Sequence, residues 1–233
     1  MTSLLTRERA AAGDPSALLV LHHGRGTTES DLLPLADAID PERRLHVVSV
    51  RAPFTLPGAP GYHWYAVPRV GHPDPESFAT SYRALAEVHD AAWERTGLGP
   101  EETVLGGFSM GTVMSYALGL GSDRPAPAGI LAFSGFVPTV EGWQPDLRSR
   151  ERTRVFIAHG RQDPVIDVAF ARRARDLLSG AGLSVAYHES EVGHQLDPAH
   201  IPLARRWFER TLAPATPVVK LVEDPAPDAA REG

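Results

Sequence analysis

The chain contains no cysteine among its 233 residues, so it has no disulfide, no thiolate metal ligand and no cysteine nucleophile. It also lacks any apolar run near the ~20 residues that a membrane-spanning helix needs. The first residues, 1–16, carry several charges and lack the apolar core of about 7–15 residues found in signal peptides. We therefore expect a cytoplasmic protein without a membrane span.

Positive charge is also scarce, because 23 basic residues face 29 acidic ones and the formal net charge is −6. This balance gives no electrostatic attraction for a phosphate backbone, so we expect no nucleic-acid partner. The sequence has neither an H-x-H nor an H-E-x-x-H metal pattern, and it has no G-K-[ST] of a phosphate-binding loop. These absences argue against a metal site of either pattern and against a phosphate-binding loop.

Short apolar runs alternate with segments of helical periodicity, and the apolar runs have the length of strands buried on both faces. The predicted strands are residues 17–22, 45–50, 103–108, 128–133, 154–159 and 183–188. The predicted helices are residues 32–39, 78–93 (capped by Ser77), 110–120, 168–178 and 202–212. Strands separated by crossover helices predict a mostly parallel, doubly wound α/β sheet with helices on both faces.

The division of the chain follows from its composition. Residues 1–212 contain no internal repeat and are expected to form one domain. Residues 213–233 are rich in proline, alanine and acidic side chains, which predicts a flexible tail. The apolar residues within 218–222 could instead form an edge strand or an arm that contacts a neighbour. Residues 51–76 hold six prolines and are predicted to form a loop.

The pentapeptide 107–111, with Ser109 at its centre, has the pattern G-x-S-x-G. It stands where a predicted strand ends and a predicted helix begins, which is the position of a nucleophile elbow. Glycine suits both flanks, because a side chain there would clash where the strand and the helix approach each other. A glycine-rich turn with a solvent-facing serine is the alternative interpretation, and the setting favours the nucleophile.

A serine hydroxyl becomes an effective nucleophile only with a base that is oriented by a carboxylate. Asp163 follows the predicted strand 154–159, and His194 follows the predicted strand 183–188. The carboxyl ends of parallel strands meet at one edge of a sheet, so both side chains are expected beside Ser109. The order Ser, Asp, His along the chain is that of α/β-hydrolases.

Other titratable residues near these motifs have structural interpretations. Asp167 is a rival acid, but it precedes a predicted helix and fits an N-cap better. His89 lies on the apolar face of a predicted helix and is expected to be a packed core residue. Glu191 and Asp197 flank the predicted base and are expected to be surface charges.

An acyl-transfer site also needs hydrogen-bond donors for the developing oxyanion. The segment His22-His23-Gly24-Arg25-Gly26 follows the first predicted strand, where the oxyanion loop of such a fold lies. We predict that the backbone N–H groups of Arg25 and Met110 are the two donors.

These motifs, in this order between about Leu18 and Phe208, resemble the phospholipase/carboxylesterase family of α/β-hydrolases. The segments that carry the resemblance are LHHGRGTTESDLLPLADAID, SVRAP, GYHWY, GGFSMG, HGRQDPVI and GHQLD. The resemblance implies an α/β-hydrolase fold, the triad Ser109, Asp163 and His194, and hydrolysis of ester or thioester bonds without a metal or organic cofactor. Arg25 departs from the family, in which an aliphatic residue is common at this position.

The substrate is expected to be a small-molecule ester with a short to medium acyl chain, because the segment 135–153 is too short for a large cap domain. The aromatic and apolar residues expected to line an open pocket are Trp64, Tyr65, Phe136, Val137 and Trp143. The same triad could also open lactones or cleave carbon–carbon bonds, and a catalytically silent binding protein with this fold is a further alternative. Family members of this size often pair, so a homodimer is an oligomeric state that the resemblance allows.

Overall fold

Six apolar segments form the parallel strands of the central sheet in the computed structural model, which describes residues 4–55, 58 and 60–213. These strands are β2 (Ala17–His22), β3 (Leu45–Val50), β6 (Thr103–Phe108), β7 (Gly129–Phe133), β8 (Arg154–Gly160) and β9 (Ser184–Ser190). The strand order is β1-β3-β2-β6-β7-β8-β9, and β2 is buried at every position. Burial on both faces explains why β2, β6 and β7 read as continuous apolar runs in the sequence, whereas the edge strand β9 is only partly buried.

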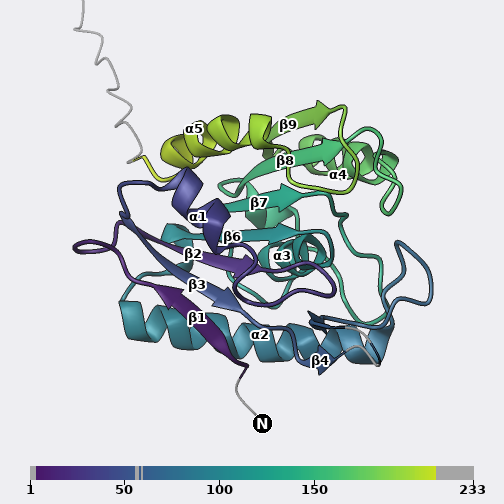
Figure 1. Ribbon diagram of the computed structural model, residues 1–233, viewed down its shortest axis with the longest axis horizontal. Helices are drawn as coiled ribbons and strands as arrows, with labels where there is room; N and C mark the ends of the chain where they lie inside the picture. Colours follow the sequence, from purple (N-terminus) through teal and green to yellow (C-terminus); the bar gives the residue numbers. More distant parts are fainter. Residues whose placement is uncertain (1–3, 56–57, 59, 214–233) are drawn as a thin grey trace, which may run out of the picture.

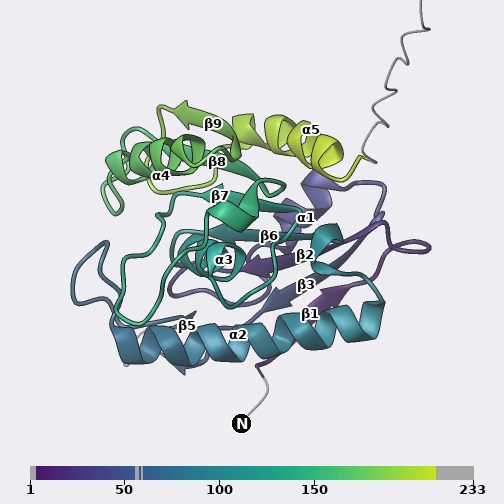
Figure 2. The same ribbon diagram turned by 180° about the vertical axis from the view of Figure 1, so that it is seen from behind.

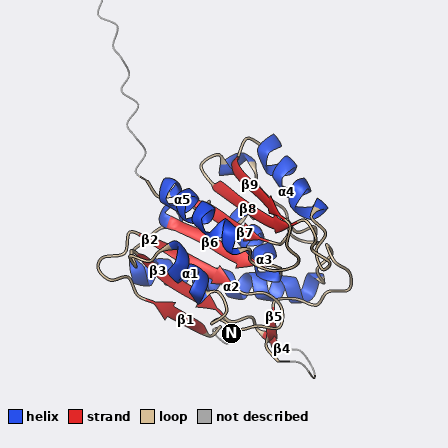
Figure 3. Ribbon diagram, turned by 45° about the horizontal axis from the view of Figure 1, so that its top comes forward, coloured by secondary structure: helices blue, strands red, loops and turns tan. Residues whose placement is uncertain are grey.

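Five helices cover the two faces of the sheet (Figures 1 and 2). They are α1 (Leu33–Ile39), α2 (Pro75–Thr96), α3 (Met110–Leu120), α4 (Ala169–Gly180) and α5 (Ile201–Thr211). The helices α1 and α5 share one apolar core with one face of the sheet, and α2, α3 and α4 pack on the other face. Figure 3 shows the strands between these two helical layers. The α/β-hydrolase prediction is therefore confirmed.

The structure also contains elements that the sequence patterns did not predict. Strand β1 (Thr6–Arg9) pairs antiparallel with β3 at the edge of the sheet. Strands β4 (Phe54–Thr55) and β5 (Tyr62–His63) form a small hairpin inside the segment that was predicted to be a loop. Short 3₁₀ helices lie at Pro100–Glu102, Arg148–Arg150 and Pro198–His200.

The edge strand β1 is held by a buried ion pair. Arg9 Nη2 lies 2.6 Å from Asp40 Oδ2, and the Asp40 carboxylate also accepts hydrogen bonds from the backbone N–H groups of Arg44 and Leu45. The polar sequence of β1 gives the strand little apolar surface to bury. The ion pair with Asp40 at the end of α1 therefore contributes to holding the strand in the sheet.

The start of α2 differs from the prediction, which made Ser77 its cap. The N-cap is Asp74, whose carboxylate accepts a hydrogen bond from Ser77 N at 2.9 Å. Pro75 occupies the first turn, where a missing N–H costs nothing, so the helix begins earlier than the apolar pattern indicated.

The predictions for the two ends of the chain are not tested. The single domain predicted over residues 1–212 stays a prediction. The predicted tail at 213–233 lies outside the described residues except for residue 213. Among the described helices, none is both long enough and apolar enough to cross a bilayer.

Candidate active site

Ser109 stands on a sharp turn between β6 and α3. Its backbone has a φ of 55°, in the left-handed region that residues other than glycine rarely adopt. A Cβ at Gly107 would lie 2.5 Å from the backbone of Gly111, and a Cβ at Gly111 would overlap the carbonyl oxygen of His22. Glycine is therefore required on both sides of the serine. The strained turn presents the Ser109 hydroxyl at the carboxyl edge of the sheet.

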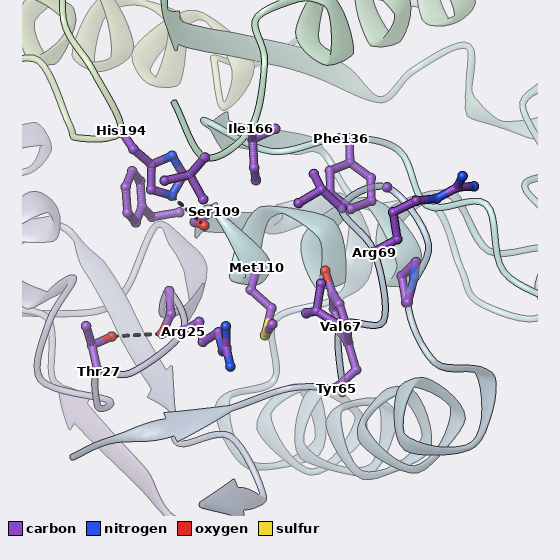
Figure 4. A pocket seen from close by; sticks show the side chains of 16 residues that line it. Arg25, Thr27, Tyr65, Val67, Arg69, Ser109, Met110, Phe136, Ile166 and His194 are labelled. Carbon is purple, nitrogen blue, oxygen red and sulfur yellow. Dashed lines mark hydrogen bonds between the residues drawn. The ribbon is translucent and has the colours of Figure 1, made fainter. Parts of the chain in front are cut away.

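The three predicted triad residues are brought together by the structure. His194 Nε2 lies 2.8 Å from Ser109 Oγ (Figure 4). On the other side of the ring, His194 Nδ1 lies 2.7 Å from Asp163 Oδ2. A carboxylate can only accept, so Nδ1 carries the proton that is donated to Asp163, and Nε2 is left to accept from the serine hydroxyl. This tautomer is the one that general-base catalysis by His194 requires.

The Asp163 carboxylate is fixed by the loop that follows β8. Its Oδ1 accepts hydrogen bonds from the backbone N–H groups of Val165 at 2.8 Å and Ile166 at 2.9 Å. Burial alone would raise the pKa of Asp163, but the hydrogen bonds from His194 and from the two amides outweigh it and hold the pKa below its ordinary value. The carboxylate therefore stays ionised beside the imidazole.

His159 is a neighbour of the triad that the sequence analysis did not identify. Its Nε2 donates to the carbonyl oxygen of Ile166 at 2.8 Å and lies 3.3 Å from Asp163 Oδ2. Burial lowers the pKa of His159, which favours the neutral imidazole. His159 thus stabilises the loop that carries Asp163. The only sequence signal for this contact is the position of His159 at the end of β8.

The loop after β2, which is predicted to be the oxyanion loop, is held by hydrogen bonds on both sides of Arg25. Gly26 N donates to Tyr62 O at 2.8 Å, and the indole of Trp64 donates to His23 O at 2.8 Å, so the loop is fixed on two sides of Arg25. The Arg25 amide donates no hydrogen bond within the described part of the chain. Met110 is the first residue of α3, where a backbone N–H has no acceptor inside the helix. Both residues line the same cavity as Ser109.

The cavity in front of Ser109 has a volume of about 310 Å³. Of the predicted wall residues, Tyr65 and Phe136 line it. The lining that the sequence analysis missed comes mainly from the connection between β5 and α2 and from the loop after Asp163. These residues are Val67, Arg69, Val70, Gly71, Pro73, Val165 and Ile166.

The other predicted wall residues lie elsewhere. Trp64 is fully buried beneath the oxyanion loop, because its indole N–H needs the carbonyl of His23 as an acceptor. Trp143 donates to Ala117 O at 3.1 Å, and together with Val137 it lines a second cavity of about 410 Å³. Phe136 and Gly71 line both cavities and so stand between them.

A buried polar cluster lies under the elbow. His22 Nδ1 is 2.8 Å from Ser115 Oγ, and His22 Nε2 is 3.2 Å from His89 Nε2. Burial lowers the pKa of both imidazoles, to about 3 for His89. His89 is buried as predicted, but it is also a hydrogen-bonding member of this cluster.

Sequence comparison places this geometry in a known family. The profile of the family described as Phospholipase/Carboxylesterase matches residues 9–210. The chain belongs to the phospholipase/carboxylesterase family. This family member is 25% identical over 227 residues to "Acyl-protein thioesterase 1" of Gibberella zeae, an alignment that covers 88% of this chain and 94% of the relative. It is 26% identical over 183 residues to "Esterase YpfH" of Escherichia coli, covering 77% of this chain and 76% of the relative.

A solved structure supports the same placement. The Bacillus cereus carboxylesterase superposes with a TM-score of 0.78 and 27% sequence identity, covering 89% of this chain and 94% of that one. This phospholipase/carboxylesterase family member is therefore an enzyme, a serine hydrolase that acts on carboxylic esters.

Proposed function

We propose that the enzyme hydrolyses small carboxylic esters through an acyl-enzyme formed on Ser109. The observation that carries the proposal is the continuous relay from the Ser109 hydroxyl through the His194 imidazole to the Asp163 carboxylate, with both hydrogen bonds at 2.8 Å or less. The open cavity of about 310 Å³ supports short to medium acyl chains.

The first half of the reaction forms the acyl-enzyme. The Ser109 oxygen attacks the ester carbonyl while His194 Nε2 takes its proton, and the backbone N–H groups of Arg25 and Met110 donate to the carbonyl oxygen as it becomes negative. His194 then gives the proton to the leaving alcohol as the bond from carbon to the alcohol oxygen breaks. Asp163 stabilises the imidazolium throughout, because its carboxylate stays ionised.

The second half regenerates the enzyme. A water molecule takes the place of the alcohol, loses a proton to His194 and attacks the acyl carbon. Collapse of the second tetrahedral intermediate releases the carboxylic acid and returns the proton to Ser109. The net reaction consumes one ester and one water and yields one acid and one alcohol.

The test is to compare the Ser109→Ala variant with wild type. We expect kcat on a neutral p-nitrophenyl ester to fall by about 10³ or more, with an unchanged melting temperature and no labelling by a fluorophosphonate probe. Ser134→Ala is a matched control, since Ser134 is a buried serine with a φ of 50° just after the neighbouring strand, and it should keep both activity and labelling. Full activity in Ser109→Ala would refute the assignment.

Substrate profiling on the same two proteins separates the alternative functions. A panel of esters, thioesters and lactones distinguishes among the bonds that this triad could cleave. Failure of wild type to react with the probe or with any member of the panel would favour a catalytically silent binding protein. Cytoplasmic localisation and homodimer formation stay predictions from the sequence.

A further inference from the structure

The cavity in front of Ser109 contains cationic side chains but no carboxylate. Most of its lining is apolar or glycine, and Arg25 and Arg69 are its two arginines (Figure 4). No aspartate or glutamate is among the residues that line it. The charge of the cavity is therefore opposite in sign to the formal net charge of the whole chain, which is −6.

Two acidic residues that lie two positions from lining residues in the sequence are paired with other groups. Glu29, in the segment that follows Arg25, forms a two-pronged ion pair with Arg51, with contacts of 2.6 and 2.8 Å. This hydrogen bonding from Arg51 holds the pKa of Glu29 below its usual value. Asp163 is engaged by His194 and by two backbone amides. Neither carboxylate is available to neutralise an arginine in the cavity.

Arg25 and Arg69 accordingly form no ion pair with any described residue. Arg69 Nη2 lies 2.5 Å from His72 Nε2, a contact in which a neutral imidazole accepts, and this contact orients the guanidinium without cancelling its charge. Burial, and after it the charge of Arg25, lowers the pKa of His63, so this charge acts on a neighbouring imidazole.

The position of Arg25 links this charge to the reaction. Its backbone N–H is one of the two proposed oxyanion donors, and its side chain leaves the same residue into the cavity. An anionic group of the substrate that contacts the guanidinium would therefore lie close to the scissile carbonyl. Planar guanidinium groups bind carboxylates through two parallel hydrogen bonds. Both arginines are exposed, so such a contact is sensitive to the salt concentration.

We propose that the preferred substrates are esters that carry a carboxylate near the scissile bond, held by Arg25 and secondarily by Arg69. This inference rests on the proposed ester hydrolysis at Ser109. The carboxylate could belong to either part of the ester, to the acid, as in a half-ester of a dicarboxylic acid, or to the alcohol, as in an acylated hydroxy acid. The hydrolysis itself is unchanged, and the arginines take part in binding only.

Two matched substrate pairs test the proposal and distinguish the two sources of the carboxylate. Monoethyl adipate against ethyl hexanoate places the charge on the acid part, and 4-acetoxybenzoate against its methyl ester places it on the alcohol part. The readout is the ratio of kcat/KM for the charged ester to that for its neutral partner. Using a ratio within each variant removes any general effect of a substitution on catalysis.

In wild type we expect a ratio above one in at least one pair. Arg25→Gln should lower that ratio by up to about fivefold, since an exposed ion pair contributes up to about that factor. Arg69→Gln should lower it less, and Arg25→Glu should invert it. Arg83→Gln is the control, because Arg83 is an exposed arginine of α2 that does not line the cavity, and it should leave the ratio unchanged. At about 1 M salt, where the Debye length is about 3 Å, the wild-type ratio should contract toward one.

The proposal is overturned if wild type prefers the neutral ester in both pairs, or if neither Arg25→Gln nor Arg69→Gln changes the ratio. Arg69 lies outside the oxyanion loop, so its variant keeps the test valid if Arg25→Gln does not fold. The outcome is separable from the function proposed above. Neutral esters hydrolysed in a Ser109-dependent way with no charge preference would remove only the anion preference.

Discussion

Replacing Asp163 by asparagine tests the relay at its most constrained point. The side chain keeps its shape, but one oxygen becomes an NH₂ group, and the structure dictates which one. Oδ1 accepts from the N–H groups of Val165 and Ile166 at 2.8 and 2.9 Å, so an NH₂ in that place would face two donors and lose two hydrogen bonds. At about 1–3 kcal/mol for each unsatisfied group, the amide is held with its oxygen toward the backbone.

The NH₂ group must then face His194 Nδ1, which lies 2.7 Å from Asp163 Oδ2. The imidazole can accept that hydrogen bond only in the tautomer that carries its proton on Nε2. Such a His194 cannot accept the proton of Ser109. We expect kcat to fall by about 10⁴, equal to about 5 kcal/mol of transition-state stabilisation, as in other serine hydrolase triads with this change.

The assay is steady-state hydrolysis of p-nitrophenyl butyrate, with thermal unfolding measured on the same preparations. Asp167→Asn is the matched control, because Asp167 is an exposed carboxylate four positions further on. Among the described residues, its side chain accepts a hydrogen bond from Ala169 N alone. It should keep nearly full activity. If Asp163→Asn retains activity within tenfold of wild type, or if Asp167→Asn is the inactive variant, the reasoning fails.

Two further predictions concern the pocket wall and the buried cluster. Phe136→Ala should join the two cavities and shift the chain-length optimum of a p-nitrophenyl ester series toward longer acyl groups, since each buried methylene contributes about 0.8 kcal/mol; an unchanged optimum would refute Phe136 as the dividing wall. His89 takes up a proton near pH 6.5 when unfolded but only near pH 3 when folded, so stability falls as the pH drops through this window. His89→Gln should therefore reduce the loss of unfolding free energy between pH 6.5 and 4.5 by about 2 kcal/mol in urea titrations, with exposed His72→Gln as control. An unchanged slope would contradict the assigned burial effect.

The parallel strands and the triad were predictable because the relevant information is local. A strand buried on both faces must be largely apolar, as β2 is over its first five residues, and this leaves a recognisable run in the sequence. Ser109, Asp163 and His194 each follow a parallel strand, so the topology brings them to one edge. The Gly107 and Gly111 flanks mark the elbow because close backbone approach permits no other residue.

The rest could not be predicted because it depends on contacts between distant segments. Strand β1 has a charged sequence and is held by the ion pair between Arg9 and Asp40. No pattern within residues 6–9 predicts this distant contact. Trp64 and Tyr65 are adjacent in the chain, yet only Tyr65 faces the cavity. Trp64 points away from the cavity because its indole N–H donates to the backbone carbonyl of His23.

The connection between β5 and α2 supplies Tyr65, Val67, Arg69, Val70, Gly71 and Pro73 to the cavity, whereas none of the triad residues comes from it. A large part of the cavity wall is thus encoded in a stretch of the polypeptide that is separate from the triad. Exchanging this one stretch for that of a relative should change the shape of the cavity while Ser109, Asp163 and His194 stay in place. Divergence within the family and laboratory redesign can both proceed along this route without disturbing the nucleophile.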